Sequence, residues 1–425
     1  MARSADYNFL PGPATPQVVA TEGSELVLAD GRRVLDGGGG AIVVNIGHGR
    51  PEIAEVAARA TSTIDYVIPP WSTPSRQALC DRLVSSWLPE GLDRIVLTSG
   101  GSESVDSAIR LAHAYHVCNG EPDRYKVIGR WPSYHGVNLG GLAAGGHRAR
   151  RAGYERLLLD FPHVVWDDPD ALEAMIEAQG PQNIAAFIAE PVIGSAGGAL
   201  VAPEDYFPRV AEICRRYGVL FIADEVMTGF GRTGRKFGVD HWDVVPDVLV
   251  GGKGLAGGYA PMGGLYARSS VTQTLADKGH GFMFFTFGAH SSACAIADRV
   301  LQILEEEDLV ARCARVGAAL KERLVDTFAD HPHVAEVRGL GLMLGLELVA
   351  ERNPHRWFPA EAQFAAAVVR EALARDLWVY PAGSGDPVQD AIMLGPPFTI
   401  SDADCDRLVT VLARAIDAAA AASLT

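Results

Sequence analysis

The sequence predicts an α/β fold with a mainly parallel central sheet, followed by a smaller α+β unit. Short apolar runs alternate with amphipathic helical segments through the middle of the chain. Each run suits a strand buried on both faces, and the runs are 126–129, 185–189, 219–223 and 248–250. Between the second and third runs, residues 203–217 have a helical pattern that opens at Pro203 and closes at Gly218. This order predicts a strand–helix–strand unit with parallel strands.

The C-terminal part of the chain has a different pattern of elements. Helices are expected at 310–328, 364–374 and 401–421, the last capped by Ser401 or Asp402, and strand-like sequence spans 334–348. We therefore place a large domain at 61–315 and a small C-terminal domain at 316–425. The pattern alone leaves open which domain residues 1–60 pack on, and we assign them to the small one.

Composition limits the class of protein. Among 425 residues, 48% are hydrophobic and 21% are charged, which is typical of a folded globular protein. The net charge of −15 lacks the basic footprint of a protein that binds nucleic acid or an anionic membrane. Residues 1–10 contain no apolar signal segment, and no run approaches 18 apolar residues. Six cysteines without a CxxC pair are typical of reduced thiols, so we expect a cytoplasmic protein.

Lys253 is the only charged residue between 248 and 266, and glycines and apolar residues surround it. Burial without a partner disfavours the ammonium form and releases a nucleophilic amine, as Schiff-base chemistry requires. The glycines would let a flat ligand approach the backbone. The alternative interpretation is a surface lysine on a loop.

Two carboxylates follow predicted strands. Glu190 follows the run 185–189 and Asp224 follows 219–223. Parallel strands place ligands at their carboxyl ends, and an unpaired carboxylate there is costly to bury. Each should therefore meet a donor, a metal or a ligand cation such as a protonated pyridine. A turn cap for Asp224 and a loop salt bridge for Glu190 are the structural alternatives.

Two further segments could bind a flat phosphorylated ligand. The Gly/Ser turn 98–103 precedes a helical pattern at 104–116, and a helix start can bind phosphate without net positive charge. Tyr134 follows the first predicted strand, where its ring could stack on a planar ligand. An ordinary helix cap and an ordinary packing aromatic are the alternatives.

Two glycine motifs and the histidines do not support other chemistry. Residues 229–234 match GxGxxG, but 235–246 show no helix for a pyrophosphate to sit on. The segment 252–254 lacks the Ser or Thr of a P-loop. The histidines have no metal-binding spacing, so no metal site is expected.

Taken in order along the chain, the motifs resemble the class III (omega-type) aminotransferases, which are pyridoxal-phosphate enzymes of fold type I. The matching segments are 45–49, 99–106, 134–136, 190–191, 224–234, 246–253, 286–288, 337–343 and 396–397. The resemblance implies a large domain that binds pyridoxal 5'-phosphate and a smaller C-terminal domain. It also implies a homodimer with shared active sites, which could pair into a tetramer.

The resemblance assigns a role to each matched position. Lys253 resembles the lysine that forms the internal aldimine and then moves the proton between the substrate Cα and the cofactor C4′. Asp224 resembles the partner of the pyridine nitrogen, which keeps the ring protonated. The remaining cofactor-binding positions are Gly101 and Ser102 at the phosphate, Tyr134 and Val226 on the two ring faces, His135, Glu190 near the 3-hydroxyl, and Thr286, which reaches the neighbouring subunit's cofactor.

Departures from the family pattern bear on the substrate. The ornithine and GABA branches pair a glutamate with a C-terminal arginine, whereas this chain has Ser195 and no arginine within 380–397. Local contacts also differ at Met227 and at 289–292. The segments 102–106 and 129–136 are most similar to the amine:pyruvate and omega-amino-acid branch, in which Trp71 would form part of the substrate pocket.

The resemblance therefore implies a ping-pong aminotransferase. An amine or omega-amino acid would donate its amino group, and a 2-oxo acid such as pyruvate would accept it. A pyridoxal-phosphate isomerase, either an aminomutase or an amino-acid epimerase, is the main alternative because it would share the cofactor residues. A cofactor-binding protein without catalysis is a third possibility, which the presence of both Lys253 and Asp224 disfavours.

Overall fold

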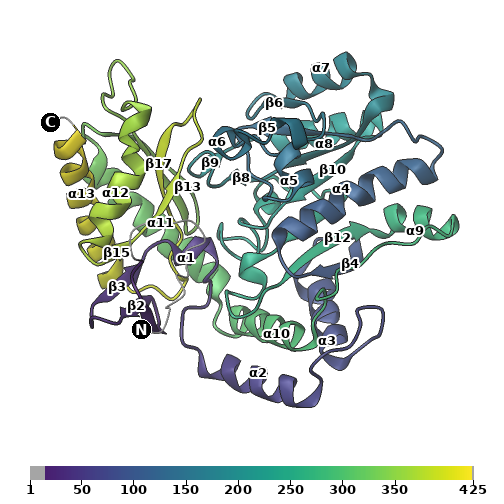
Figure 1. Ribbon diagram of the computed structural model, residues 1–425, viewed down its shortest axis with the longest axis horizontal. Coiled ribbons are helices and arrows are strands. Elements are labelled where there is room, and N and C mark those ends of the chain that lie inside the picture. Colours follow the sequence, from purple (N-terminus) through teal and green to yellow (C-terminus); the bar gives the residue numbers. More distant parts are fainter. Residues whose placement is uncertain (1–14, 424–425) are drawn as a thin grey trace, which may run out of the picture.

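A large central sheet lies beside a smaller antiparallel sheet in the computed structural model, which describes residues 15–423 (Figure 1). Within those residues the central sheet has seven strands, in the spatial order β4 (Leu92–Thr98), β12 (Gly263–Arg268), β11 (Val248–Gly251), β10 (Leu220–Asp224), β7 (Ile184–Ala189), β5 (Lys126–Trp131) and β6 (His163–Val165). Strand β12 runs opposite to the other six strands of this sheet. The predicted α/β fold with a mainly parallel sheet is confirmed.

Both faces of the central strands β7 and β10 are buried because a continuous apolar run fills β7 and the first four positions of β10. In β10, Ile222 packs with α4 (Gly101–Cys118) on one face, while Phe221 packs with α8 (Tyr206–Tyr217) on the other. Since neighbouring strand residues point to opposite faces, a continuous apolar run supplies both layers. This packing fixes the carboxyl ends of β7, β10 and β11 at one edge of the sheet.

Most predicted elements are present, with shifted ends. Strand β5 continues two residues beyond the predicted 126–129, and α8 begins at Tyr206 instead of Pro203. Pro203 belongs to a preceding turn, in which its carbonyl accepts a hydrogen bond from the Tyr206 N–H. The left-handed residue Gly218 ends α8, as predicted.

The smaller sheet is antiparallel and comes from the C-terminal part of the chain. Its spatial order is β13 (Val334–Leu340), β14 (Met343–Leu348), β17 (Asp390–Leu394) and β16 (Tyr380–Ala382). The predicted strand-like segment 334–348 is thus a hairpin. The helices α11 (Leu309–Phe328) and α12 (Phe364–Leu373) pack on this sheet, and α13 (Asp402–Ser423) packs on both helices (Figure 1). Ser401 caps α13 by accepting a hydrogen bond from the Asp404 N–H.

A third sheet joins the first strands of the described chain to its C-terminal part. It contains β1 (Val18–Glu22), β2 (Glu25–Leu28), β3 (Arg33–Asp36) and the C-terminal strand β15 (Leu377–Trp378). Strands β3 and β15 pair in parallel, and Figure 1 shows them side by side next to α13. The domain limits at 60 and 315 stay a proposal.

The remaining elements cover the sheets or connect them. The helices are α1 (Gly39–Ile42), α2 (Pro51–Thr63), α3 (Pro74–Arg82), α5 (Leu139–Ala144), α6 (Arg148–Arg151), α7 (Pro169–Gln179), α9 (Ser269–Asp277) and α10 (Ser291–Glu306). A short hairpin is formed by β8 (Val192–Ile193) and β9 (Leu200–Val201).

The GxGxxG segment connects the two parts of the molecule. Arg232 is buried and donates hydrogen bonds to the Asn45 side chain and to the Leu342 and Pro396 carbonyls. The expectation of no helix at 235–246 needs a correction, because a five-residue 3-10 helix spans Gly238–Trp242. The segment therefore has a structural role, since three buried oxygens depend on one guanidinium.

No helix in the described part of the chain is long and apolar enough to cross a membrane. All six cysteines are free thiols, and Cys214, Cys294, Cys313 and Cys405 are buried. The predicted lack of a signal segment concerns residues 1–10, which lie outside the described residues.

Candidate active site

Most of the predicted site residues lie around one cavity at the carboxyl edge of the central sheet. The cavity has a volume of about 190 Å³. Its lining consists of Gly101, Ser102, Val105, Tyr134, His135, Gly136, Glu190, Asp224, Val226, Met227 and Lys253. These residues come from five segments far apart in the sequence, which the parallel strands bring to one edge.

Lys253 follows β11 and begins a short 3-10 helix, Lys253–Leu255. Its φ of +42° is in the left-handed region, which costs a non-glycine residue roughly 1 kcal/mol. The next residue must be glycine, because a Cβ on Gly254 would lie 2.3 Å from Asn45 Nδ2. Burial lowers the pKa of the Lys253 amine, although the nearby carboxylates of Asp224 and Glu190 act in the opposite direction. The predicted desolvation of this lysine is therefore present.

Asp224 ends β10 and is buried against His135. His135 Nδ1 lies 2.7 Å from Asp224 Oδ2, and Asp224 Oδ1 accepts a hydrogen bond of 3.1 Å from the Val226 N–H. The opposite ring nitrogen of His135, Nε2, is buried without a protein partner among the described residues. The pair holds the carboxylate in a fixed orientation at the cavity wall.

Glu190 is also buried, and both of its oxygens bind backbone N–H groups. One oxygen accepts from Tyr134 and the other from Gly194, each at 3.0 Å. Burial raises the pKa of the Glu190 carboxyl. Because these bonds join the segment after β5 to the segment after β7, Glu190 fixes the backbone beneath the Tyr134 ring.

The start of α4 forms another wall of the cavity. The residue that precedes the helix, Gly100, provides no side-chain cap, so an anion could bind the first backbone N–H groups of α4. Ser102 lies at this end and its Oγ accepts from the Val137 N–H at 3.4 Å. A Cβ on Gly101 would lie 2.6 Å from Val226 Cγ1, so only glycine allows this close packing.

Two predicted residues lie outside this cavity. Thr286 is exposed, and its carbonyl accepts a hydrogen bond from the Tyr66 hydroxyl. Trp71 is 69% exposed. Conversely, Val105, Gly136 and Met227 line the cavity but were not predicted as site residues. Val105 lies one helical turn after Ser102, and this spacing could have identified it.

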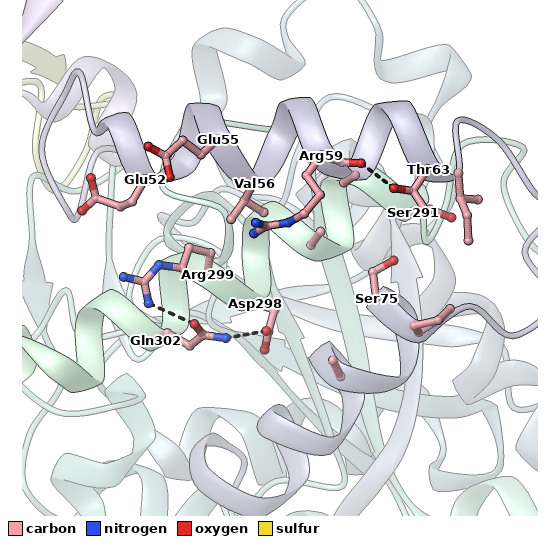
Figure 2. Close-up of a pocket in the computed structure, with 15 residues that line it drawn as sticks. Glu52, Glu55, Val56, Arg59, Thr63, Ser75, Ser291, Asp298, Arg299 and Gln302 are labelled. Carbon is pink, nitrogen blue, oxygen red and sulfur yellow. Dashed lines mark hydrogen bonds between the residues drawn. The ribbon is translucent and has the colours of Figure 1, made fainter.

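A larger cavity of about 600 Å³ lies between α2, α3 and α10 (Figure 2). Figure 2 shows Gln302 hydrogen-bonded to both Arg299 and Asp298 on its floor. None of the predicted site residues lines it. The smaller cavity is therefore the candidate active site, because only there do a desolvated amine, buried carboxylates and a helix start converge.

Comparison with known proteins decides the family. The family described as Aminotransferase class-III matches residues 12–416. The chain belongs to the class III aminotransferases. It is accordingly a pyridoxal-phosphate-dependent transaminase of fold type I, as the sequence predicted.

Relatives of this aminotransferase match it over nearly their whole length. The putrescine–pyruvate aminotransferase of Pseudomonas aeruginosa is 32% identical, and the match covers 99% of this chain and 94% of that protein. An (S)-enantioselective omega-transaminase from Thermomicrobium roseum is 37% identical with a TM-score of 0.90, and the match covers 95% of this chain and 93% of that protein. A transaminase from the marine bacterium Virgibacillus is 35% identical with a TM-score of 0.91, and the match covers 96% of this chain and 94% of that protein.

The cavity of this aminotransferase fits pyridoxal phosphate by its chemistry. Lys253 supplies an amine for the aldehyde, Asp224 a carboxylate for a protonated pyridine, and α4 an anion-binding helix start. The unpartnered Nε2 of His135 also leaves a polar atom at the cavity wall for a ligand. Within residues 15–423 no cluster of three or more His, Cys, Asp or Glu residues could hold a metal ion.

Proposed function

We propose that this aminotransferase moves an amino group from an amine or omega-amino acid to a 2-oxo acid, with pyruvate as the principal acceptor, by a ping-pong mechanism. The observation that carries this proposal is the meeting of Lys253, Asp224 and the α4 start in one cavity. Ping-pong transfer follows because one cavity must hold the donor and the acceptor in turn.

The individual residues would act as follows. When bound, pyridoxal phosphate supplies an aldehyde that receives the amino group and a ring that accepts electrons from the substrate Cα. Lys253 would bind the aldehyde and then carry the proton to and from Cα. Asp224, held by His135, would keep the pyridine nitrogen protonated. Tyr134 and Val226 would contact opposite ring faces, while Glu190 would lie near the 3-hydroxyl, and Gly101 and Ser102 would bind the phosphate.

The choice of pyruvate is supported by what the site lacks. Relatives at 32% identity include both the putrescine–pyruvate aminotransferase and a diaminobutyrate–2-oxoglutarate transaminase of Halomonas elongata, so identity does not separate the acceptors. Ser195 is buried with its hydroxyl unpartnered among the described residues, and segment 380–397 has no arginine. Both the glutamate and the arginine of the gate that admits a dicarboxylate are therefore absent from these positions.

A half-reaction assay tests the proposed transfer. The holoenzyme is mixed with an amine or omega-amino acid alone, and the amino form of the bound cofactor should accumulate in stoichiometric amount. Pyruvate should then reverse the spectrum and yield alanine. Conversion of a single amino acid to its isomer, with no need for an acceptor, would instead show the isomerase alternative.

We further propose that the protein is a homodimer in which Thr286 contacts the partner's cofactor. Thr286 lies among exposed apolar side chains, and such patches mark interaction surfaces. The patch consists of Tyr66, Ile68, Trp71, Met283, Phe284 and Phe287, and the Tyr66 and Phe287 rings are 6.2 Å apart. Trp71 would then face the substrate pocket across the interface. A cytoplasmic location also stays a prediction.

Light scattering tests the dimer. Phe287→Asp should shift the holoenzyme from dimer toward monomer on dilution. In a two-fold interface each subunit contributes the same residue, so two unpaired carboxylates would be buried. Val325→Asp changes an exposed apolar residue on α11 and should leave the mass unchanged. A wild-type monomer at micromolar concentration would contradict the proposal.

A further inference from the structure

The proposed transfer to a 2-oxo acid leaves one requirement unmet, namely a cation for the acceptor's carboxylate. The inference below rests on that proposed function. Lys253 is committed to the cofactor and His135 to Asp224. His147 lies near Tyr134, but burial lowers its pKa to about 4, so it is neutral at physiological pH.

Arg150 on α6 lies against Tyr134, a wall of the cavity. Its guanidinium carbon is 4.7 Å from the centroid of the Tyr134 ring. The side chain is exposed, and among the described residues it has no ion pair and no side-chain hydrogen bond. Its charge also reaches the cavity, since Arg150 adds to the effect of burial in lowering the pKa of Lys253.

The other arginines near the cavity are either held by hydrogen bonds and ion pairs or packed on a residue outside its lining. Arg130 donates to the carbonyls of Glu190 and Trp166. Arg151 donates to the carbonyls of Leu142, Ala143 and Gly145, and Arg338 pairs with Glu336 and Glu347. Arg148 has no ion pair among the described residues, but it stacks on Trp131, which does not line the cavity.

We propose that Arg150 binds the carboxylate of the 2-oxo acid acceptor. A guanidinium stacked on an aromatic ring keeps its edge donors free, and these donors match a carboxylate in a bidentate pair. Tyr134 thereby orients the arginine beside the cavity. A donor amine without a carboxylate needs no such contact, and the long exposed side chain can turn away from it.

Kinetics of Arg150→Gln test this role, with Arg148→Gln as the matched control from the same helix. The KM for pyruvate should rise about tenfold to a hundredfold in Arg150→Gln, as expected for the loss of a hydrogen-bonded charge pair. Turnover of propanal, an acceptor without a carboxylate, should be unchanged. Arg150→Lys should restore part of the pyruvate affinity, because lysine keeps the positive charge but cannot form the bidentate pair of a guanidinium. Arg148→Gln should behave as wild type.

A binding measurement separates this inference from the proposed function. Propanoate cannot accept an amino group, so its binding to the holoenzyme can be followed by calorimetry even if no transfer occurs. Arg150→Gln should weaken that binding about tenfold or more while Arg148→Gln does not. Equal losses for pyruvate and propanal, or equal effects of both substitutions, would overturn the role of Arg150. Absence of transfer in the wild type, with Arg150-dependent propanoate binding, would instead refute only the proposed reaction.

Discussion

Replacing Lys253 by alanine is expected to reduce transamination by about 10³-fold or more. The amine is the only group at the cavity that can both bind the cofactor's aldehyde and carry the substrate proton, and general acid–base catalysis alone contributes up to about 10⁴-fold. Alanine also lacks the covalent link. Borohydride reduction followed by peptide mass spectrometry should therefore find the cofactor attached to residue 253 in the wild type and to no peptide in the variant.

Lys278→Ala is the control for this experiment, because Lys278 ends α9 on the surface, outside the cavity lining. It should keep full activity and the same labelled peptide. Substantial turnover by Lys253→Ala, or labelling of another lysine in the wild type, would refute the assignment of Lys253.

Asp224→Asn is expected to lower turnover by roughly 10² to 10³-fold, the range found when one preorganised electrostatic group is removed. Asparagine keeps the shape of the side chain and can still accept from the Val226 N–H, but it carries no negative charge. The pyridine nitrogen would then lose the partner that holds its proton, so the ring would accept electrons less readily. Single-turnover rates with a saturating amine measure this loss.

Asp243→Asn serves as the matched control, since the Asp243 side chain is almost fully exposed and lies outside the cavity lining. Thermal unfolding of both variants separates a catalytic defect from a folding defect. A normal single-turnover rate in Asp224→Asn would mean that this carboxylate only supports His135.

Local sequence predicted the central strands well because burial on both faces leaves a continuous apolar run. The run 219–223 became β10, and its next residue, Asp224, ends the strand at the cavity. Element ends were less predictable: α8 begins three residues after Pro203, because a turn precedes the helix. The 3-10 helix Gly238–Trp242 was also not predicted, since so short an element lacks a helical period.

The sequence by itself predicted the family, a mainly parallel sheet and Lys253 as the candidate cofactor lysine, because each prediction depends on residue types at fixed local spacing. Only the tertiary structure decided which side chains meet. The 2.7 Å contact of His135 with Asp224, the pairing of β3 with β15 and the stacking of Arg150 on Tyr134 required the folded chain. Such contacts depend on strand register and on how the connecting segments turn back, and neither leaves a periodic pattern in the sequence.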